Sequence, residues 1–276
     1  MDSLWPTLRN PVAILAFGGW NDAGDAATAV LTHLRSHYPT TFVHEIASED
    51  FWDYQSNRPR THISSTGRVL SWPHISVNIV KLPDQDLVVF EGPEPNLKWR
   101  TFATLILDEI TAINPELVVL LGAMLSDSPH SRPLPLSGSS SDQQLFSRLN
   151  LEPNSYEGPS GIVGVLTDTF TSSELSVVSL WISVPHYVAT PPSPKATMSL
   201  INALENLLQT PLDLGDLPEQ ITKWEQRVTE LTSDYSDIAE YVATLENMSD
   251  KVDQAEGTAE QIAAEFEEYL KSSKDD

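Results

Sequence analysis

The chain has 276 residues, 40% of them hydrophobic, no cysteine and a formal net charge of −23. The missing cysteines exclude disulfides and thiolate metal sites, and the negative charge disfavours contact with phosphate backbones, so we expect no nucleic-acid partner. No apolar run approaches the roughly 20 residues that span a membrane. Residues 1–10 also lack the apolar core of a signal peptide, so we expect a cytoplasmic protein that does not bind membranes.

The charge is unevenly distributed along the chain. Residues 211–276 carry 18 acidic and 5 basic side chains, a net charge of −13, which leaves −10 for the first 210 residues. This difference predicts two units: a core domain over residues 1–210 and an acidic helical extension over residues 211–276. A solvated helical surface explains such charge, and a halophilic habit or a basic protein partner is the alternative.

Strands and helices are predicted to alternate through the first 210 residues. Apolar runs predict strands at residues 12–17, 42–46, 69–80 with a break at Trp72-Pro73, 87–90, 117–121 and 177–184. Helical spacing of apolar residues follows at 26–34, 102–113, 162–169 and 194–208. This alternation predicts an α/β fold with three layers and a mostly parallel sheet. Residues 133–141, rich in Pro, Ser and Gly, are predicted to form a mobile surface loop.

The extension shows a regular apolar seam. Positions at 3-4-3-4 spacing are Ile221, Trp224, Val228, Leu231, Tyr235, Ile238, Val242 and Leu245. Such a seam indicates a coiled-coil-like arm. It is either one long helix or a hairpin that breaks at Ser233-Asp234, and its apolar face packs either within one subunit or between subunits. Thr258 and Gln261 form a capping-box pattern that predicts a further helix.

Polar side chains follow several of the predicted strands. They are Asn21, Asp22, Glu91, Glu94, Asp127, His130, Arg132, His186 and Tyr187. Ligands of parallel α/β sheets gather beyond the carboxyl ends of the strands. These residues therefore predict a ligand-binding rim at one edge of the sheet.

The loop Gly18–Gly24 lacks the G-x-G-x-x-G spacing of a dinucleotide site, and Asp22 or Asp25 is expected to cap the following helix. Gly158, Ser160 and Gly161 precede a predicted helix, where backbone N–H groups favour a small anion, although Gly-Pro pairs also form ordinary turns. Neither metal-ligand spacing nor a complete catalytic motif is present, so we predict no metal site and commit to no catalytic residue.

Two basic segments have open interpretations. Arg132 is suited to bind a carboxylate or phosphate and His130 to move protons near neutral pH, or both hold their loop in place through Asp127 or backbone carbonyls. Arg58 and Arg60 follow the aromatic segment 51–54. That mixture suits either a protein contact or a loop anchored by cation–π packing.

Taken together, the segments GGWNDAG, EDFWDYQSNRPR, FEGPEPNLKWRTF, LGAMLSDSPHSRP, YEGPSGIVG and VPHYV resemble the proteasome assembly chaperone 2 family, and most of all its actinobacterial branch. The resemblance runs from about residue 11 to residue 270. It implies a core like that of nucleoside phosphorylases and peptidyl-tRNA hydrolases, a helical C-terminal extension, and homo-oligomers, among which a trimer is favoured. The activity of bacterial members is not settled.

We therefore expect a cytoplasmic, homo-oligomeric binding or scaffold protein, similar to an assembly chaperone, with a protein partner and without established catalysis. The alternative is an enzyme that acts on a small anionic substrate, a nucleoside or phosphoester. In that case Arg132 would orient the anion, residues 158–161 would cradle it, and His130 or Glu91 would transfer protons. The residues identify no cofactor.

Overall fold

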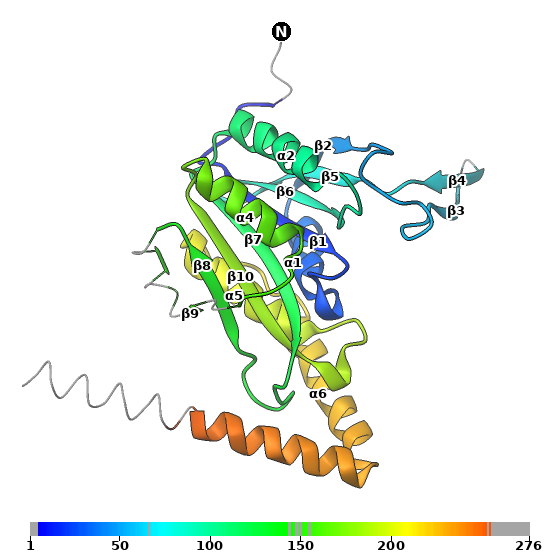
Figure 1. Ribbon diagram of the computed structural model, residues 1–276, viewed down its shortest axis with the longest axis vertical. Coiled ribbons are helices and arrows are strands. Elements are labelled where there is room, and N and C mark those ends of the chain that lie inside the picture. Colours follow the sequence, from blue (N-terminus) through cyan, green and yellow to red (C-terminus); the bar gives the residue numbers. More distant parts are fainter. Residues whose placement is uncertain are drawn as a thin grey trace, which may run out of the picture.

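The computed structural model describes residues 5–252 and 254, apart from residues 66, 143–144, 147–148, 150 and 154–155. Its elements are β1 (Val12–Gly18), η1 (Ala23–Asp25), α1 (Ala26–His37), β2 (Thr40–Ile46), β3 (Arg60–Ser64), β4 (Gly67–Ser71), β5 (Ile75–Lys81), β6 (Asp86–Pro93), α2 (Trp99–Ile113), β7 (Leu117–Ser126), β8 (Leu136–Ser140), β9 (Glu152–Pro153), α4 (Ile162–Ser172), β10 (Val177–Pro185), η2 (His186–Val188), α5 (Pro194–Leu208), α6 (Leu217–Ser233) and a helix over residues 236–252 (Figure 1). Within this described part, no helix combines the length and apolar character that a membrane crossing requires.

One large sheet positions the loops of the molecule. Its eight described strands follow the order β2-β5-β6-β1-β7-β10-β8-β9, and β3 and β4 form a separate hairpin. The four central strands β6, β1, β7 and β10 are parallel neighbours, whereas β5 and β8 run antiparallel to β6 and β10. The predicted α/β fold with a mostly parallel sheet is therefore confirmed.

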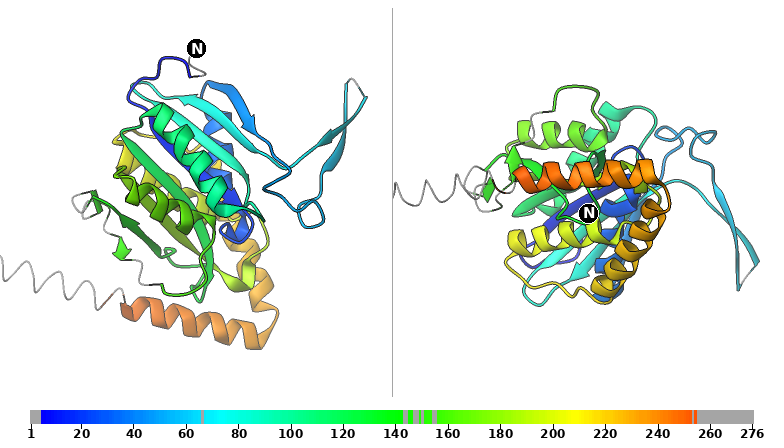
Figure 2. Two further views of the ribbon diagram at one scale, coloured as in Figure 1. Left: turned by 45° about the horizontal axis from the view of Figure 1, so that its top comes forward. Right: turned by 90° about the horizontal axis from the view of Figure 1, so that it is seen from below.

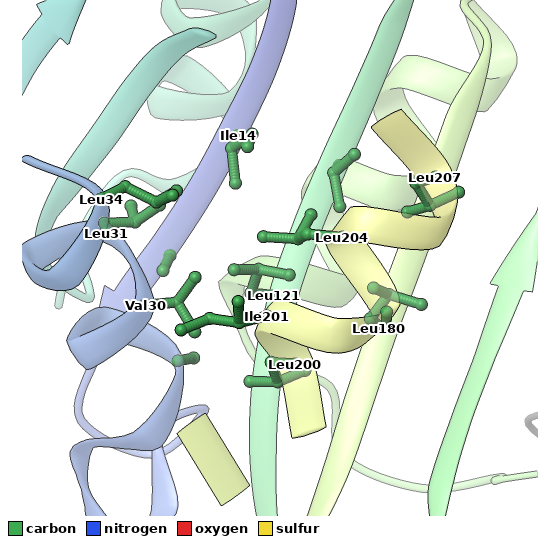
Figure 3. Close-up of a cluster of buried hydrophobic side chains, with 14 of the residues drawn as sticks. Ile14, Val30, Leu31, Leu34, Leu121, Leu180, Leu200, Ile201, Leu204 and Leu207 are labelled. Carbon is green, nitrogen blue, oxygen red and sulfur yellow. The ribbon is translucent and has the colours of Figure 1, made fainter. Parts of the chain in front are cut away.

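Helices cover both faces of this sheet, which gives the three predicted layers (Figures 1 and 2). Alternate residues of β1 face opposite layers because side chains alternate along a strand. Ile14 packs in the cluster under α1 and α5, and Leu15 packs in the cluster under α2 and α4. Figure 3 shows the first cluster, where Ile201 and Leu204 of α5 lie close to Leu121 of β7. Both faces of the central strands are thus closed to solvent along their continuous apolar runs, whereas Met124 and Leu125 near the end of β7 are exposed.

The prediction of a mobile loop at residues 133–141 is wrong. Residues 136–140 form β8, which pairs antiparallel with β10 from Leu136↔Ile182 to Ser140↔Val178. Gly138 permits this pairing because a Cβ on it would overlap the carbonyl oxygen of Ser179. The small residues that suggested a loop therefore serve a close approach between two backbones.

The tail forms two helices rather than one. α6 ends at Ser233, and the helix over residues 236–252 begins after a short break. The first packs against α5, and the second crosses beyond the carboxyl ends of β7 and β10 (Figure 2). The break expected at Ser233-Asp234 is therefore present, but the two helices meet at a wide angle and do not form an antiparallel hairpin (Figures 1 and 2). Both helices contact the body of their own chain. The helix predicted from Thr258 and Gln261 lies outside the described residues.

Truncation of the core at Leu121 tests this packing. Leu121 is fully buried between β1, β10 and α5. We expect Leu121→Ala to lower the free energy of unfolding by about 2–5 kcal/mol, because it removes apolar contacts and leaves a cavity. Urea unfolding followed by circular dichroism measures the change. The matched control, Leu97→Ala at an exposed position outside the tail, is expected to change it by about 0.5 kcal/mol or less. Equal effects of the two substitutions would contradict the assignment of the core.

Candidate functional site

The start of α4 is held by a carboxylate of the chain itself. Glu94 accepts hydrogen bonds from the side-chain amide of Asn21 (2.6 Å) and from the backbone N–H of Ile162 (2.8 Å), the first residue of α4. A carboxylate is stabilised here by unpaired N–H groups and by the positive end of the helix dipole. Gly161 leaves room for this arrangement, because a Cβ on it would overlap Asn21 Oδ1. Glu94 thus lies where the glycine-rich turn was predicted to bind a small anion.

The other two residues of that turn face outwards. Gly158 packs against the ring of Tyr156, and Ser160 lines a hollow of about 410 Å³ between α2 and α4. Arg100 and Asp168 line the same hollow. Gly158 and Ser160 are both exposed, whereas Asn21 is buried, so these two residues do not share the environment of Asn21.

Asp22 caps the first helix from the loop after β1. Its carboxylate accepts hydrogen bonds from the backbone N–H groups of Ala27 (2.6 Å) and Thr28 (3.3 Å), and from the Thr28 hydroxyl. This confirms the capping expected of the loop. Burial raises the pKa of Asp22 to about 6, although the hydrogen bonds from Thr28 and Ala27 act in the opposite direction.

His130 is buried in the loop between β7 and β8. Its backbone N–H donates to the hydroxyl of Tyr187 in η2 (2.8 Å), and its Nδ1 lies 2.9 Å from the same hydroxyl. Burial raises the pKa of Tyr187 to about 12, so this hydroxyl stays protonated and donates to Nδ1. Nε2 then carries the ring proton and donates to Thr229 Oγ1 on α6 (3.0 Å). Lys195 donates to the carbonyl of His130 and to Glu225 Oε1, both at 2.6 Å. Burial lowers the pKa of His130, so the ring is held neutral between η2 and α6.

Arg132 and Asp127 attach the same loop to helix 236–252. The guanidinium of Arg132 donates to both carboxylate oxygens of Asp250, at 2.7 and 3.0 Å. Asp127 accepts a hydrogen bond from the hydroxyl of Tyr241 (3.0 Å) and lies 3.2 Å from Nδ1 of His186. The loops that follow β7 and β10 are therefore connected to each other and to the second tail helix.

Glu91 lies in a separate environment near the end of β6. Its carboxylate accepts a hydrogen bond from the hydroxyl of Thr32 (3.1 Å) and pairs with Arg35 (2.8 Å), both on α1. Burial raises the pKa of Glu91, and the charge of Arg35 partly offsets that effect. Glu91 also lines a cavity of about 730 Å³ that is not lined by His130 or Arg132.

The predicted rim residues thus form three groups. Asn21, Asp22, Glu94 and Gly161 organise the starts of α1 and α4; Asp127, His130, Arg132, His186 and Tyr187 meet the tail helices; and Glu91 belongs to the cavity beside α1. The sequence did not predict that the loop containing His130 and Arg132 binds the tail helices. The available signal was the opposite charge of Arg132 and the acidic segment 211–276. Among the residues that the structure describes, no three His, Asp or Glu side chains gather as a metal ion would require.

The buried carboxyl of Asp22 makes a specific pH dependence testable. The folded chain holds the Asp22 proton up to a pH of about 6, whereas an aspartic acid side chain in the unfolded chain releases it near the ordinary pKa of 3.8. The contribution of Asp22 to stability is therefore fully present below that lower value and is lost as the pH rises through about 6. We expect the unfolding free energy of the wild type, relative to Asp22→Asn, to fall by on the order of 3 kcal/mol across this interval. Urea titrations at several pH values measure the difference, and a constant difference would refute the raised pKa.

Removal of the carboxylate that binds Arg132 tests how the second tail helix is attached. In Asp250→Asn one neutral hydrogen bond at most replaces the two charge-assisted ones, and Glu246, 3.8 Å from Arg132, is the acidic neighbour that stays. We therefore expect several-fold faster amide hydrogen exchange over residues 236–252 and unchanged exchange in β1 and β7. Asp237→Asn makes the same chemical change on the same helix away from the loop, and its exchange is expected to match the wild type. Unchanged exchange in Asp250→Asn would show that the ion pair does not hold the helix.

The comparisons with known proteins agree with this architecture. The PAC2 family model matches residues 16–232. A PAC2 family protein from Streptomyces avermitilis is 42% identical, with a TM-score of 0.79, over 84% of this chain and 99% of that one. A proteasome-assembly chaperone homologue from Mycobacterium tuberculosis is 40% identical, with a TM-score of 0.77 and the same coverage. A Pyrococcus furiosus protein, PbaB, described as an archaeal proteasome activator, shares the fold at 16% identity and a TM-score of 0.66, over 82% of this chain and 95% of that one.

No curated protein matches the chain. The resemblance that the sequence motifs suggested is confirmed by the family model, which spans most of the chain, and by two solved structures with at least 40% identity. The chain belongs to the PAC2 family.

Proposed function

We propose that the chain is a homo-oligomeric, cytoplasmic scaffold that binds protein and works like an assembly chaperone. Its core, residues 1–210, presents an acidic helical arm formed by residues 211–276, and the arm contacts the partner. The observation that carries the proposal is an apolar surface left exposed where the two helices of the arm meet.

This surface, the elbow patch, consists of Leu231, Tyr235 and Ile238. The three residues continue the apolar seam of the tail, yet their exposed fractions are 53%, 63% and 38%. Val228 before them and Val242 after them are buried against the body of the chain. The apolar seam is therefore buried before and after the break between the two helices and exposed at the break itself. Exposed apolar residues that gather in one place are typical of a surface that binds a second protein.

The polar residues that follow the strands are already paired within the chain, and this supports a scaffold rather than an enzyme. That alternative needed Arg132, His130 and the turn at residues 158–161 to meet around one substrate. Arg132 is instead paired with Asp250, and His130 is held by Tyr187 and α6. The start of α4 carries Glu94. Groups that are already paired by their own chain serve packing well and leave little binding capacity for a small anion.

The names of related proteins indicate the kind of partner. The Mycobacterium tuberculosis relative is described as a proteasome-assembly chaperone homologue, and the Pyrococcus furiosus neighbour as a proteasome activator. We therefore propose that the partner is a proteasome subunit, and that the acidic arm presents the elbow patch to it.

Charge placed on the elbow patch tests both parts of the proposal. We expect the wild type to be an oligomer by light scattering and to accelerate ring formation by purified α-type proteasome subunits of the same organism, followed by mass photometry. The double variant Leu231→Asp/Tyr235→Asp is expected to lose at least one of these properties, because two carboxylates cannot be buried in an apolar contact without a large desolvation cost.

The matched control places the same two charges on the polar face of α6, in Thr222→Asp/Gln226→Asp. Both positions are exposed, so wild-type behaviour is expected. Circular dichroism of each variant checks that it is folded. A wild-type chain that is monomeric and leaves ring formation unchanged would refute the proposal, and so would a double variant at the patch that retains both properties.

A further inference from the structure

A basic cavity is lined by residues that belong neither to the loop after β7 nor to the tail helices. The cavity, of about 730 Å³, is bordered by the end of α1, by β5 and β6, and by residues 55–60, which lead into the projecting hairpin β3–β4 (Figure 1). Its volume falls within the range of pockets that hold small organic ligands, about 300–1,000 Å³. Arg35, Arg58, Arg60, Trp72, His74 and Glu91 are among its lining residues.

The charge of this cavity is opposite to that of the chain. The cavity is lined by three guanidinium groups and by a single carboxylate, that of Glu91. This carboxylate is already paired with Arg35 at 2.8 Å. Across the described part of the chain, the side chains of Arg58 and Arg60 form neither a hydrogen bond nor an ion pair, although the chain contains 39 acidic residues. Both residues are exposed and line the same cavity, so their guanidinium groups are available to an anion that comes from outside the chain.

The third arginine also has unused bonding capacity. The Nε atom of Arg35 is buried and has no hydrogen-bond partner in the described structure, while its Nη2 holds Glu91. An unsatisfied buried donor costs free energy. The Arg35 side chain also lines the cavity, where it adds a third positive charge. Guanidinium groups bind phosphate oxygens with two parallel hydrogen bonds each, so the set is suited to a phosphate group.

An aromatic side chain adds a second kind of contact. Trp72 lines the cavity, its exposed fraction is 47%, and its ring is supported by Tyr54 at a centroid distance of 4.7 Å. The two rings are tilted by 57° rather than stacked, and the half-exposed indole of Trp72 provides an aromatic surface for a flat ligand ring. Phosphate recognition by arginines and a stacking surface are thus combined in one cavity.

We propose that this cavity binds a small phosphate ester that carries a planar ring, a molecule of the nucleoside monophosphate class. Arg58 and Arg60 hold the phosphate, and Trp72 stacks on the ring. The site is independent of the elbow patch, which lies on the tail helices.

Calorimetric titration of the full chain with AMP, adenosine and inorganic phosphate tests the proposal. We expect AMP to bind more tightly than either fragment, and its affinity to fall as salt is added. In Arg58→Ala/Arg60→Ala the affinity for AMP is expected to drop by about tenfold or more, because charge-assisted hydrogen bonds are lost. Trp72→Ala is expected to weaken AMP while it leaves inorganic phosphate unchanged.

The control is Arg68→Ala, on the same hairpin but outside the lining of the cavity, which is expected to bind AMP like the wild type. The elbow variant Leu231→Asp/Tyr235→Asp is also expected to retain AMP binding, so that failure of the scaffold proposal and failure of this one are distinguishable. Equal affinity for adenosine and AMP would overturn the proposal. Undiminished AMP binding by Arg58→Ala/Arg60→Ala, or binding of an oligoglutamate peptide in place of AMP, would overturn it as well.

Discussion

The burial of β1 on both faces is the constraint on which the rest of the molecule depends. Ile14 and Leu15 are adjacent in the chain and pack into different helical layers, so the same strand contributes to both halves of the core. The parallel neighbours β6 and β7 then align with β1, and their carboxyl ends reach the same edge of the sheet. That edge collects polar loops because backbone groups leaving a buried strand need water or partners.

The molecule satisfies most of those polar loops with its own side chains. Glu94 serves the start of α4, Asp22 serves the start of α1, and the tail helices serve the loop that holds His130. The acidic composition of the tail has a local purpose at this edge, because Asp250 and Glu225 neutralise Arg132 and Lys195. In the described part of the tail, other acidic side chains are exposed to solvent, and these are Glu219, Glu230, Asp234, Asp237 and Glu240.

The sequence predicted the core well and the contacts of its edge poorly. Continuous apolar runs and helical spacing depend on burial, which is a property that a single segment carries, so β1, β7, β10, α2 and α5 were found at their places. The strand at residues 136–140 was missed because its small residues fit beside Ser179 of β10, a contact that no local pattern encodes. The partners of His130 and Arg132 are about 100 residues away, and only the folded path of the tail brings Thr229 and Asp250 to them. The cavity near Glu91 escaped prediction for the same reason, since α1, β6 and the segment before β3 each supply one wall.

The position of the tail also has a consequence for biosynthesis. The ribosome completes the sheet and its four covering helices before it releases the residues that cover the loops after β7 and β10. Until Thr229 and Asp250 leave the exit tunnel, the ring of His130 and the guanidinium of Arg132 lack these two partners. The segment that carries Thr229 and Asp250 is thus translated after the loop that it covers, and a ribosome that terminates before this segment would leave these two basic groups without those partners.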